Sequence, residues 1–119
     1  MATSIINIDK AELVFNESVN YTDNTYFKYV QVMGWKMGNI AWLNIVVRAN
    51  EASSSPVALP STFNLPTALR PMVEAYVTAG VRIRTIASTI VIATNGQFTI
   101  DSIEADKWYV ANTSYITAT

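Results

Sequence analysis

The residue types that carry most enzymatic chemistry are missing from this chain of 119 residues. It contains no histidine and no cysteine, so neither a Ser-His-Asp nor a Cys-His nucleophilic device can be built. Its nine aspartates and glutamates show no spacing typical of the paired carboxylates that hydrolyse glycosides. We therefore expect a non-catalytic protein with no catalytic residues and no cofactor.

The same absences limit metal binding. Zinc sites with Cys or His ligands are excluded, which leaves oxygen-bound cations such as calcium. Asp101, Glu104 and Asp106 could supply carboxylate oxygens. Their segment lacks the glycine and the regular oxygen spacing of an EF-hand loop, so we expect no metal site.

Charge and hydropathy narrow the range of partners. Eight Lys and Arg residues against nine Asp and Glu residues give a net charge of -1, which is too little positive charge for nucleic-acid binding. No stretch approaches the roughly 18 to 20 apolar residues that cross a bilayer, and residues 1–10 lack the pattern of a signal peptide. We expect neither membrane insertion nor export. Asn, Ser and Thr together make 32 residues, and such a surface suits neutral polar ligands or close contacts between subunits.

The elements that must position any binding residues are β-strands. The chain has 12 Val, 12 Ile and 13 Thr against only 5 Leu, a composition that favours pleated strands over helices. No segment carries a helical apolar stripe longer than about one and a half turns. The length fits one domain. We predict an all-β fold, an antiparallel β-sandwich or jelly-roll-like arrangement of six to eight strands.

Alternation and turn residues give the positions of the strands. The Asn95-Gly96 pair, between two apolar runs, predicts a hairpin with a type I′ turn and a positive φ at Asn95. The predicted order is a short strand 13–15, a loop or irregular edge 16–25, a strand 29–33 that ends at Gly34, a long strand 39–49, a long loop 51–69, a strand 74–80, the hairpin 88–93 and 98–103, and a last strand 108–117.

The strand 39–49 is apolar on both faces. One face is continuous and is expected to lie in the core: Ala41, Leu43, Ile45, Val47 and Ala49. The opposite face holds Ile40, Trp42, Asn44, Val46 and Arg48 and is too apolar to lie freely in water. Either a loop of the same chain or a partner subunit covers it. Ile40, Trp42 and Val46 are therefore the candidate subunit-interface residues.

Four segments, taken in order, resemble a known family. They are KMGNIAWLN at 36–44, LPTALRP at 65–71, IVIATNGQFTI at 90–100, and lastly WYV at 108–110 with SYIT at 114–117. This order is similar to the C-terminal head domain of receptor-binding and baseplate proteins of phages that infect Gram-positive bacteria. The resemblance spans about residues 28 to 117. It predicts a head domain over 28–119, preceded by an N-terminal strand and linker-like segment over 1–27.

The resemblance implies a role as well as a fold. Such heads form homotrimers at the tip of a phage tail or baseplate, contact other tail proteins, and bind cell-wall or surface saccharides of the host for adsorption. The protein would then be a virion component assembled in the host cytoplasm. Lactococcal members often place a histidine in the saccharide site, and this chain has none. Two alternatives stay open, a structural tail, baseplate or capsid-type component without a ligand, and a carbohydrate-binding module of a cellular enzyme.

Saccharide recognition needs an aromatic ring against the C–H face of a sugar and polar groups for its hydroxyls. Trp35 follows Gly34 at a predicted turn, and Trp108 follows the polar segment 104–107. We expect both side chains to be partly exposed, although each could instead be structural.

Charged residues supply the polar candidates. Arg82 and Arg84 lie on one side of an extended segment and could bind vicinal hydroxyls or a phosphate, or could pair with nearby carboxylates. Asp101 faces outward on the predicted hairpin and could accept hydroxyls or simply be solvated. Arg70, between Leu69 and Pro71, is expected to fix its loop.

Overall fold

The computed structural model describes residues 11–81 and 87–119, and these residues form strands with antiparallel pairing throughout. The predicted all-β antiparallel fold is therefore confirmed. In the described ranges no helix is long and apolar enough to cross a membrane. The strands are β1 (Glu12–Asn20), β2 (Phe27–Met37), β3 (Ile40–Ala49), β4 (Val57–Ala58), β5 (Ala75–Val81), β6 (Ala87–Ile92), β7 (Phe98–Ile100) and β8 (Trp108–Ile116), with two 3-10 turns, η2 (Ser61–Phe63) and η3 (Thr67–Leu69).

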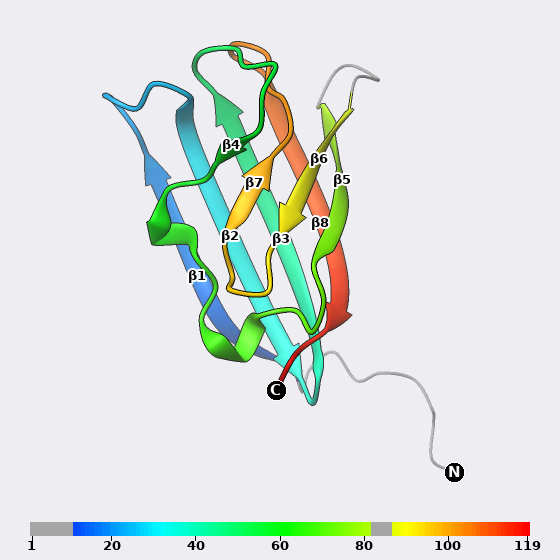
Figure 1. Ribbon diagram of the computed structural model, residues 1–119. Helices are drawn as coiled ribbons and strands as arrows, with labels where there is room; N and C mark the ends of the chain where they lie inside the picture. The colour runs from blue at the N-terminus through cyan, green and yellow to red at the C-terminus, as the bar shows by residue number, and fades with distance from the viewer. Residues whose placement is uncertain (1–10, 82–86) are drawn as a thin grey trace.

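The eight strands belong to one sheet that folds over on itself. Their order is β1-β2-β3-β8-β5-β6-β7-β4. β5 pairs with β6 over six residues, whereas among the described residues it pairs with β8 only at Gly80 and Val81, so the sheet bends at β5. β6 and β7 thus come to lie in front of β2 and β3 (Figure 1). The result is two layers with the core between them.

Residues of both layers and of the long loop build the core. β3 supplies the face predicted from its alternation, and Ala41, Leu43, Ile45, Val47 and Ala49 are all buried. β2 adds Val30 and Val32. The facing layer and the loop add Val77, Ala79, Ile90, Ile92, Phe98, Ile100, Leu59, Phe63, Leu65 and Leu69, and the cluster also contains Phe27, Ile103, Tyr109 and Ala111.

Gly34 does not end a strand, contrary to the prediction. β2 continues to Met37, and Trp35 therefore lies within a strand and not at a turn. A Cβ at position 34 would lie 2.6 Å from Leu69 Cδ1 and 2.9 Å from Leu43 Cδ2. The glycine leaves room for the leucine of η3, and close approach of this kind is a common reason for glycine inside a strand.

The two hairpin turns differ from the predicted one. The chain reverses between β2 and β3 at Gly38 and Asn39, with Gly38 at φ +60°, as in a two-residue loop with glycine first. Between β6 and β7 the predicted hairpin is confirmed, but its type I′ turn is wrong. Among the residues of that loop only Gly96 has a positive φ, at +90°. The hydrogen bonds from Gly96 N to Ala93 O and from Ala93 N to Gln97 O define a three-residue loop with glycine last.

The first strand is longer than predicted. Residues 16–20 extend β1 and pair with β2 from Asn16↔Met33 to Asn20↔Tyr29. Their polar composition predicted a loop, but β1 is an edge strand, and most of its side chains are exposed. Polar residues suit such a position.

The long loop between β3 and β5 closes one side of the core. Arg70 donates from Nε to the carbonyl of Leu65 at 3.2 Å, which confirms that this arginine fixes the loop. Tyr115 of β8 donates to the carbonyl of Leu69. Leu65 N also donates to Gly96 O. The loop is thereby tied to both layers.

Candidate functional site

The candidate site lies on the face of β1, β2, β3 and β8 that points away from the core, here called the outer face. Paired residues of antiparallel strands point to the same side of a sheet. Trp35 pairs with Trp42, and Trp42 pairs with Ser114. Two residues further along each strand, Met33, Asn44 and Asn112 form the next row on the same side. The register thus brings two tryptophans and two asparagines from three strands together.

All of these residues except Met33 line a hollow of about 750 Å³, here called the tryptophan hollow. Sites for small molecules commonly measure about 300–1,000 Å³. Both indoles are partly exposed. The described residues that line the hollow are Ala11, Trp35, Trp42, Leu43, Asn44, Asn112, Thr113 and Ser114.

The polar groups of the hollow are neutral. Asn44 donates from Nδ2 to Asn112 Oδ1 at 2.8 Å, which fixes the two amides relative to each other. Each asparagine amide has two N–H donors and an oxygen with two lone pairs, so one shared bond leaves several groups for a ligand. With two aromatic surfaces beside them, these amides suit a neutral ligand that has both hydroxyls and an apolar face.

A second set of residues lies at the other end of the outer face. Tyr29 pairs with Arg48, and Arg48 pairs with Trp108. The guanidinium carbon of Arg48 lies 5.4 Å from the centre of the Trp108 ring, within the range of a cation–π contact. The Tyr29 ring is 5.8 Å from that of Trp108 and tilted by 53°. These three residues are called the Arg48–Trp108 cluster.

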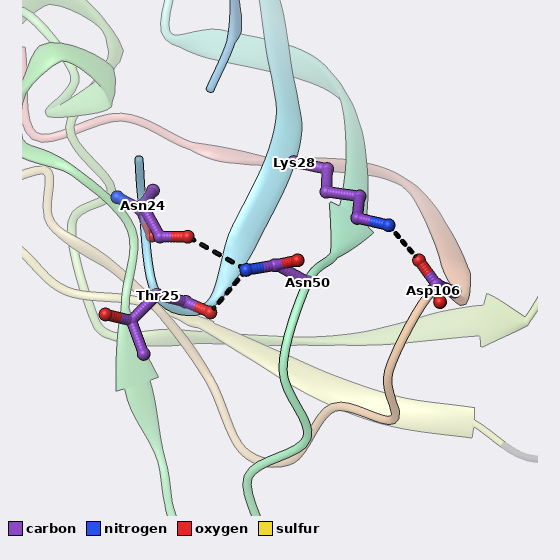
Figure 2. Close-up of polar contacts among 5 residues, drawn as sticks. All are labelled: Asn24, Thr25, Lys28, Asn50 and Asp106. Carbon is purple, nitrogen blue, oxygen red and sulfur yellow. Dashed lines mark hydrogen bonds and ion pairs between the residues drawn. The ribbon is translucent and has the colours of Figure 1, made fainter. Parts of the chain in front are cut away.

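Charged residues flank this cluster. Lys28 forms an ion pair with Asp106 (Figure 2), and its hydrogen bond and charge lower the pKa of the Asp106 carboxyl. The charges of Arg48 and Lys107 lower the pKa of Asp106 further.

Asn50 holds the adjoining loops together by donating from Nδ2 to the carbonyls of Asn24 and Thr25, at 3.1 and 3.0 Å (Figure 2).

The predicted ligand residues are only partly brought together. Trp35 and Trp108 share the outer face but lie at opposite ends of it. Asp101 follows β7 in the other layer, is exposed as predicted, and does not join them. Its charge raises the pKa of Tyr76 on β5, after the larger effects of Glu74. Arg82 and Arg84 lie outside the described residues.

The predicted interface residues lie among the ligand candidates. Ile40, Trp42 and Val46 are partly exposed on the outer face, whereas the core residues of the long loop pack on the inner one. Trp42 lines the tryptophan hollow with Trp35, so these two predicted groups do not form separate surfaces.

Six polar or aromatic residues of the site were not predicted from the sequence, namely Tyr29, Asn44, Arg48, Asn112, Thr113 and Ser114. Asn44 and Arg48 are an even number of residues from Trp42 on the same strand, and this spacing was the sequence signal that could have placed them on the face of Trp42. Asn112 and Tyr29 join them only through strand pairing.

The carboxylates of 101–106 do not converge. Within residues 11–81 and 87–119 no group of three or more Asp or Glu side chains is placed to hold a metal ion.

Comparisons with known proteins concern the fold. No protein-family model matches the sequence, and no curated protein matches it. Among solved structures, the chain is similar to the fiber head domain of the Atadenovirus snake adenovirus 1, with a TM-score of 0.51 and 9% sequence identity over 87% of this chain and 92% of that chain. The chain therefore has an all-β fold similar to that of a viral fibre head.

Proposed function

We propose that this protein is the receptor-binding head of a viral tail fibre or baseplate, and that it binds a saccharide on the surface of the host cell. The tryptophan hollow is the observation that carries the proposal. Trp35 and Trp42 offer aromatic surfaces for the C–H faces of sugar rings, and the Asn44–Asn112 pair offers donors and acceptors for hydroxyls. The likeness to a viral fibre head supports the same role.

The proposed head binds its ligand without cleaving it. Hydrolysis of a glycosidic bond ordinarily needs two carboxyl groups about 5 to 10 Å apart. No Asp or Glu is found among the described residues that line the tryptophan hollow. The ligand would therefore be held by stacking and hydrogen bonds, and released unchanged.

The host and the virion context rest on the sequence motifs. The order of the Gly-Asn strand, the Leu-Pro-x-x-x-Arg-Pro loop and the Asn-Gly hairpin resembles that of phage heads specific for Gram-positive bacteria. We therefore propose a phage that binds a cell-wall or surface saccharide of such a host, with the head at the tail tip or baseplate, attached to other tail proteins.

A homotrimer completes the proposal. Exposed apolar residues gather where the β2–β3 hairpin and the C-terminus lie, at the lower end in Figure 1. Ile116 pairs with Ile40, and Met72 N donates to the carbonyl of Ile116. The exposed fractions are 54% for Ile116, 58% for Met72 and 70% for the neighbouring Val73. Ile40 and Ile116 form the row next to Trp42 and Ser114 on the outer face, so a contact between copies centred on these residues would adjoin the tryptophan hollow.

The direct test is binding of the purified protein to cell-wall polysaccharide isolated from a susceptible Gram-positive strain. We expect saturable binding that Trp35→Ala and Trp42→Ala each weaken at least tenfold, while circular dichroism and melting temperature show a folded protein. Tyr76→Ala is the matched control, because Tyr76 is an aromatic residue that is 70% exposed on the other layer. Its affinity should not change.

Two outcomes would replace this proposal. A trimer that binds neither cells nor polysaccharide would be a structural tail component whose exposed apolar end serves assembly. A catalytic domain encoded beside this segment in the same gene would indicate a carbohydrate-binding module of a cellular enzyme.

A further inference from the structure

The Arg48–Trp108 cluster has no role in the binding of a neutral sugar at the tryptophan hollow. Trp42 and Arg48 point to the same side of β3 and are six residues apart, a separation of about 20 Å along the strand. A single sugar ring in the tryptophan hollow cannot reach the cluster. What the cluster could bind must therefore be argued from its own geometry and charge.

The geometry of the cluster is fixed before any ligand arrives. Strand pairing places Tyr29, Arg48 and Trp108 side by side on three adjacent strands. The indole of Trp108 lies against the Arg48 guanidinium and, at an angle, against the ring of Tyr29. The Nε of Arg48 is buried and has no hydrogen-bond partner among the described residues. Because Nε is buried, an acceptor would reach Arg48 through the terminal Nη groups, and the contact with the Trp108 ring reduces the side-chain freedom that binding would cost.

The charge around the cluster favours an anion. Lys28, Arg48 and Lys107 all act on the single carboxylate of Asp106, so cations outnumber it although the whole chain has a net charge of -1. The ion pair of Asp106 with Lys28 is the only one within residues 11–81 and 87–119, and it is at the surface, where such pairs are weak. An anionic ligand could therefore take the place of Asp106 at low cost.

We infer that the Arg48–Trp108 cluster is a subsite for the acidic substituent, a carboxylate or a phosphate, of the saccharide that the head binds. The inference rests on the proposed function for the sugar itself. Arg48 donates hydrogen bonds to two oxygens of the acidic group, as guanidinium does with carboxylates and phosphates. Lys28 and Lys107 add charge, and the exposed part of the Trp108 and Tyr29 rings contacts the sugar ring. Asp106 competes with the ligand for Lys28.

The test is a nuclear magnetic resonance titration of the ¹⁵N-labelled protein with glucose, glucuronic acid and glucose 6-phosphate at constant ionic strength. We expect the two acidic sugars to shift the Trp108 indole N–H and the Arg48 Nε–H signals saturably, and glucose to leave both unmoved. The stronger of the two acidic probes identifies a carboxylate or a phosphate as the preferred group. Equal responses to glucose and to both acidic sugars at Trp108 would overturn the inference.

Variants separate this subsite from the tryptophan hollow. Arg48→Gln should abolish the response to acidic sugars and leave the Trp35 and Trp42 indole signals responsive to wall polysaccharide. Asp106→Asn removes the competing carboxylate with little change in shape and should tighten binding of the acidic sugar about three- to tenfold, an effect that damage to the fold could not produce. An unchanged or weaker affinity in Asp106→Asn would contradict the subsite while the proposed function stands. Failure of every sugar and of the polysaccharide to shift any signal would overturn both.

Discussion

Single residues decide whether the outer face can act as a binding surface. Asn44 and Asn112 lie on different strands, and each would be an ordinary polar surface residue alone. Their side chains are hydrogen-bonded to each other across β3 and β8. Together they present a fixed set of donors and acceptors beside the indoles of Trp35 and Trp42. Uncharged hydrogen-bonding groups next to aromatic surface are what distinguish this hollow from a purely apolar contact.

Gly96 is the residue on which the fold depends most sharply. Its φ is +90°, and a Cβ would lie 2.6 Å from the carbonyl oxygen and 2.9 Å from the nitrogen of Leu65. Backbone atoms cannot move aside as a flexible side chain can. We predict that Gly96→Ala lowers the free energy of unfolding by about 2 kcal/mol or more, measured by urea denaturation.

Gly80→Ala is the control for that substitution. No atom of the described residues lies within 4 Å of a Cβ at position 80, and Gly80 is in a strand, where alanine is tolerated. It should unfold within about 0.5 kcal/mol of the unchanged protein. Equal stability of the two variants would contradict the assignment of the β6–β7 turn.

At the scale of elements, the contact between β8 and the long loop closes the core. Tyr115 packs against the core and donates to the carbonyl of Leu69, and burial raises the pKa of its hydroxyl. The folded protein therefore holds this proton more tightly than the unfolded chain does. Stability from Tyr115 is complete below about pH 10, the pKa of a free tyrosine, and falls as the pH rises above that value.

We predict that Tyr115→Phe lowers the free energy of unfolding at pH 7 by about 1 kcal/mol, through the lost hydrogen bond. The same variant should lose less stability than the unchanged protein between about pH 10 and pH 12. Denaturation curves at a series of pH values measure both effects. Tyr26→Phe, on the exposed loop before β2, is the control. If Tyr115→Phe lost as much stability between about pH 10 and pH 12 as the unchanged protein does, the explanation would be refuted.

Elements with strong alternation or with turn residues were predictable from the sequence. Examples are the alternate residues of β3 that face the core and the hairpin at Asn95-Gly96. Residues 16–20 were misassigned because their polarity was taken as a loop signal, whereas pairing with β2 made them an edge strand. Gly34 was misassigned because its cause, the approach of Leu69, comes from a segment more than 30 residues away.

At the scale of the whole molecule, topology decides which residues meet. β8 lies between β3 and β5, about 60 residues from β3 in the sequence. This long-range pairing brings Trp108 to Arg48 and Asn112 to Asn44, and it separates both from Asp101 in the other layer. Alternation shows which side of a strand a residue is on but not which strand is its neighbour. The tryptophans of the site could therefore be named from the sequence, but Tyr29, the asparagines and the shape of the site could not.

The proposed trimer is tested by its exposed apolar end. We predict that the protein has a mass near three times 13.1 kDa by light scattering, and that Ile116→Lys dissociates it without loss of the folded monomer, because a charge cannot be buried in an apolar contact without a large cost. Tyr26→Lys, at the other end of the sheet, should remain trimeric. A monomeric unchanged protein, or a trimer of Ile116→Lys, would contradict this contact.

The central claim is that the tryptophan hollow binds a saccharide. The most direct measurement follows the three indole N–H signals of the ¹⁵N-labelled protein while oligosaccharides released from the host cell wall are added. We predict that the signals of Trp35 and Trp42 shift together and saturably, with the same dissociation constant. Binding of the oligosaccharides without any change at Trp35 and Trp42, or no binding at all, would contradict the claim.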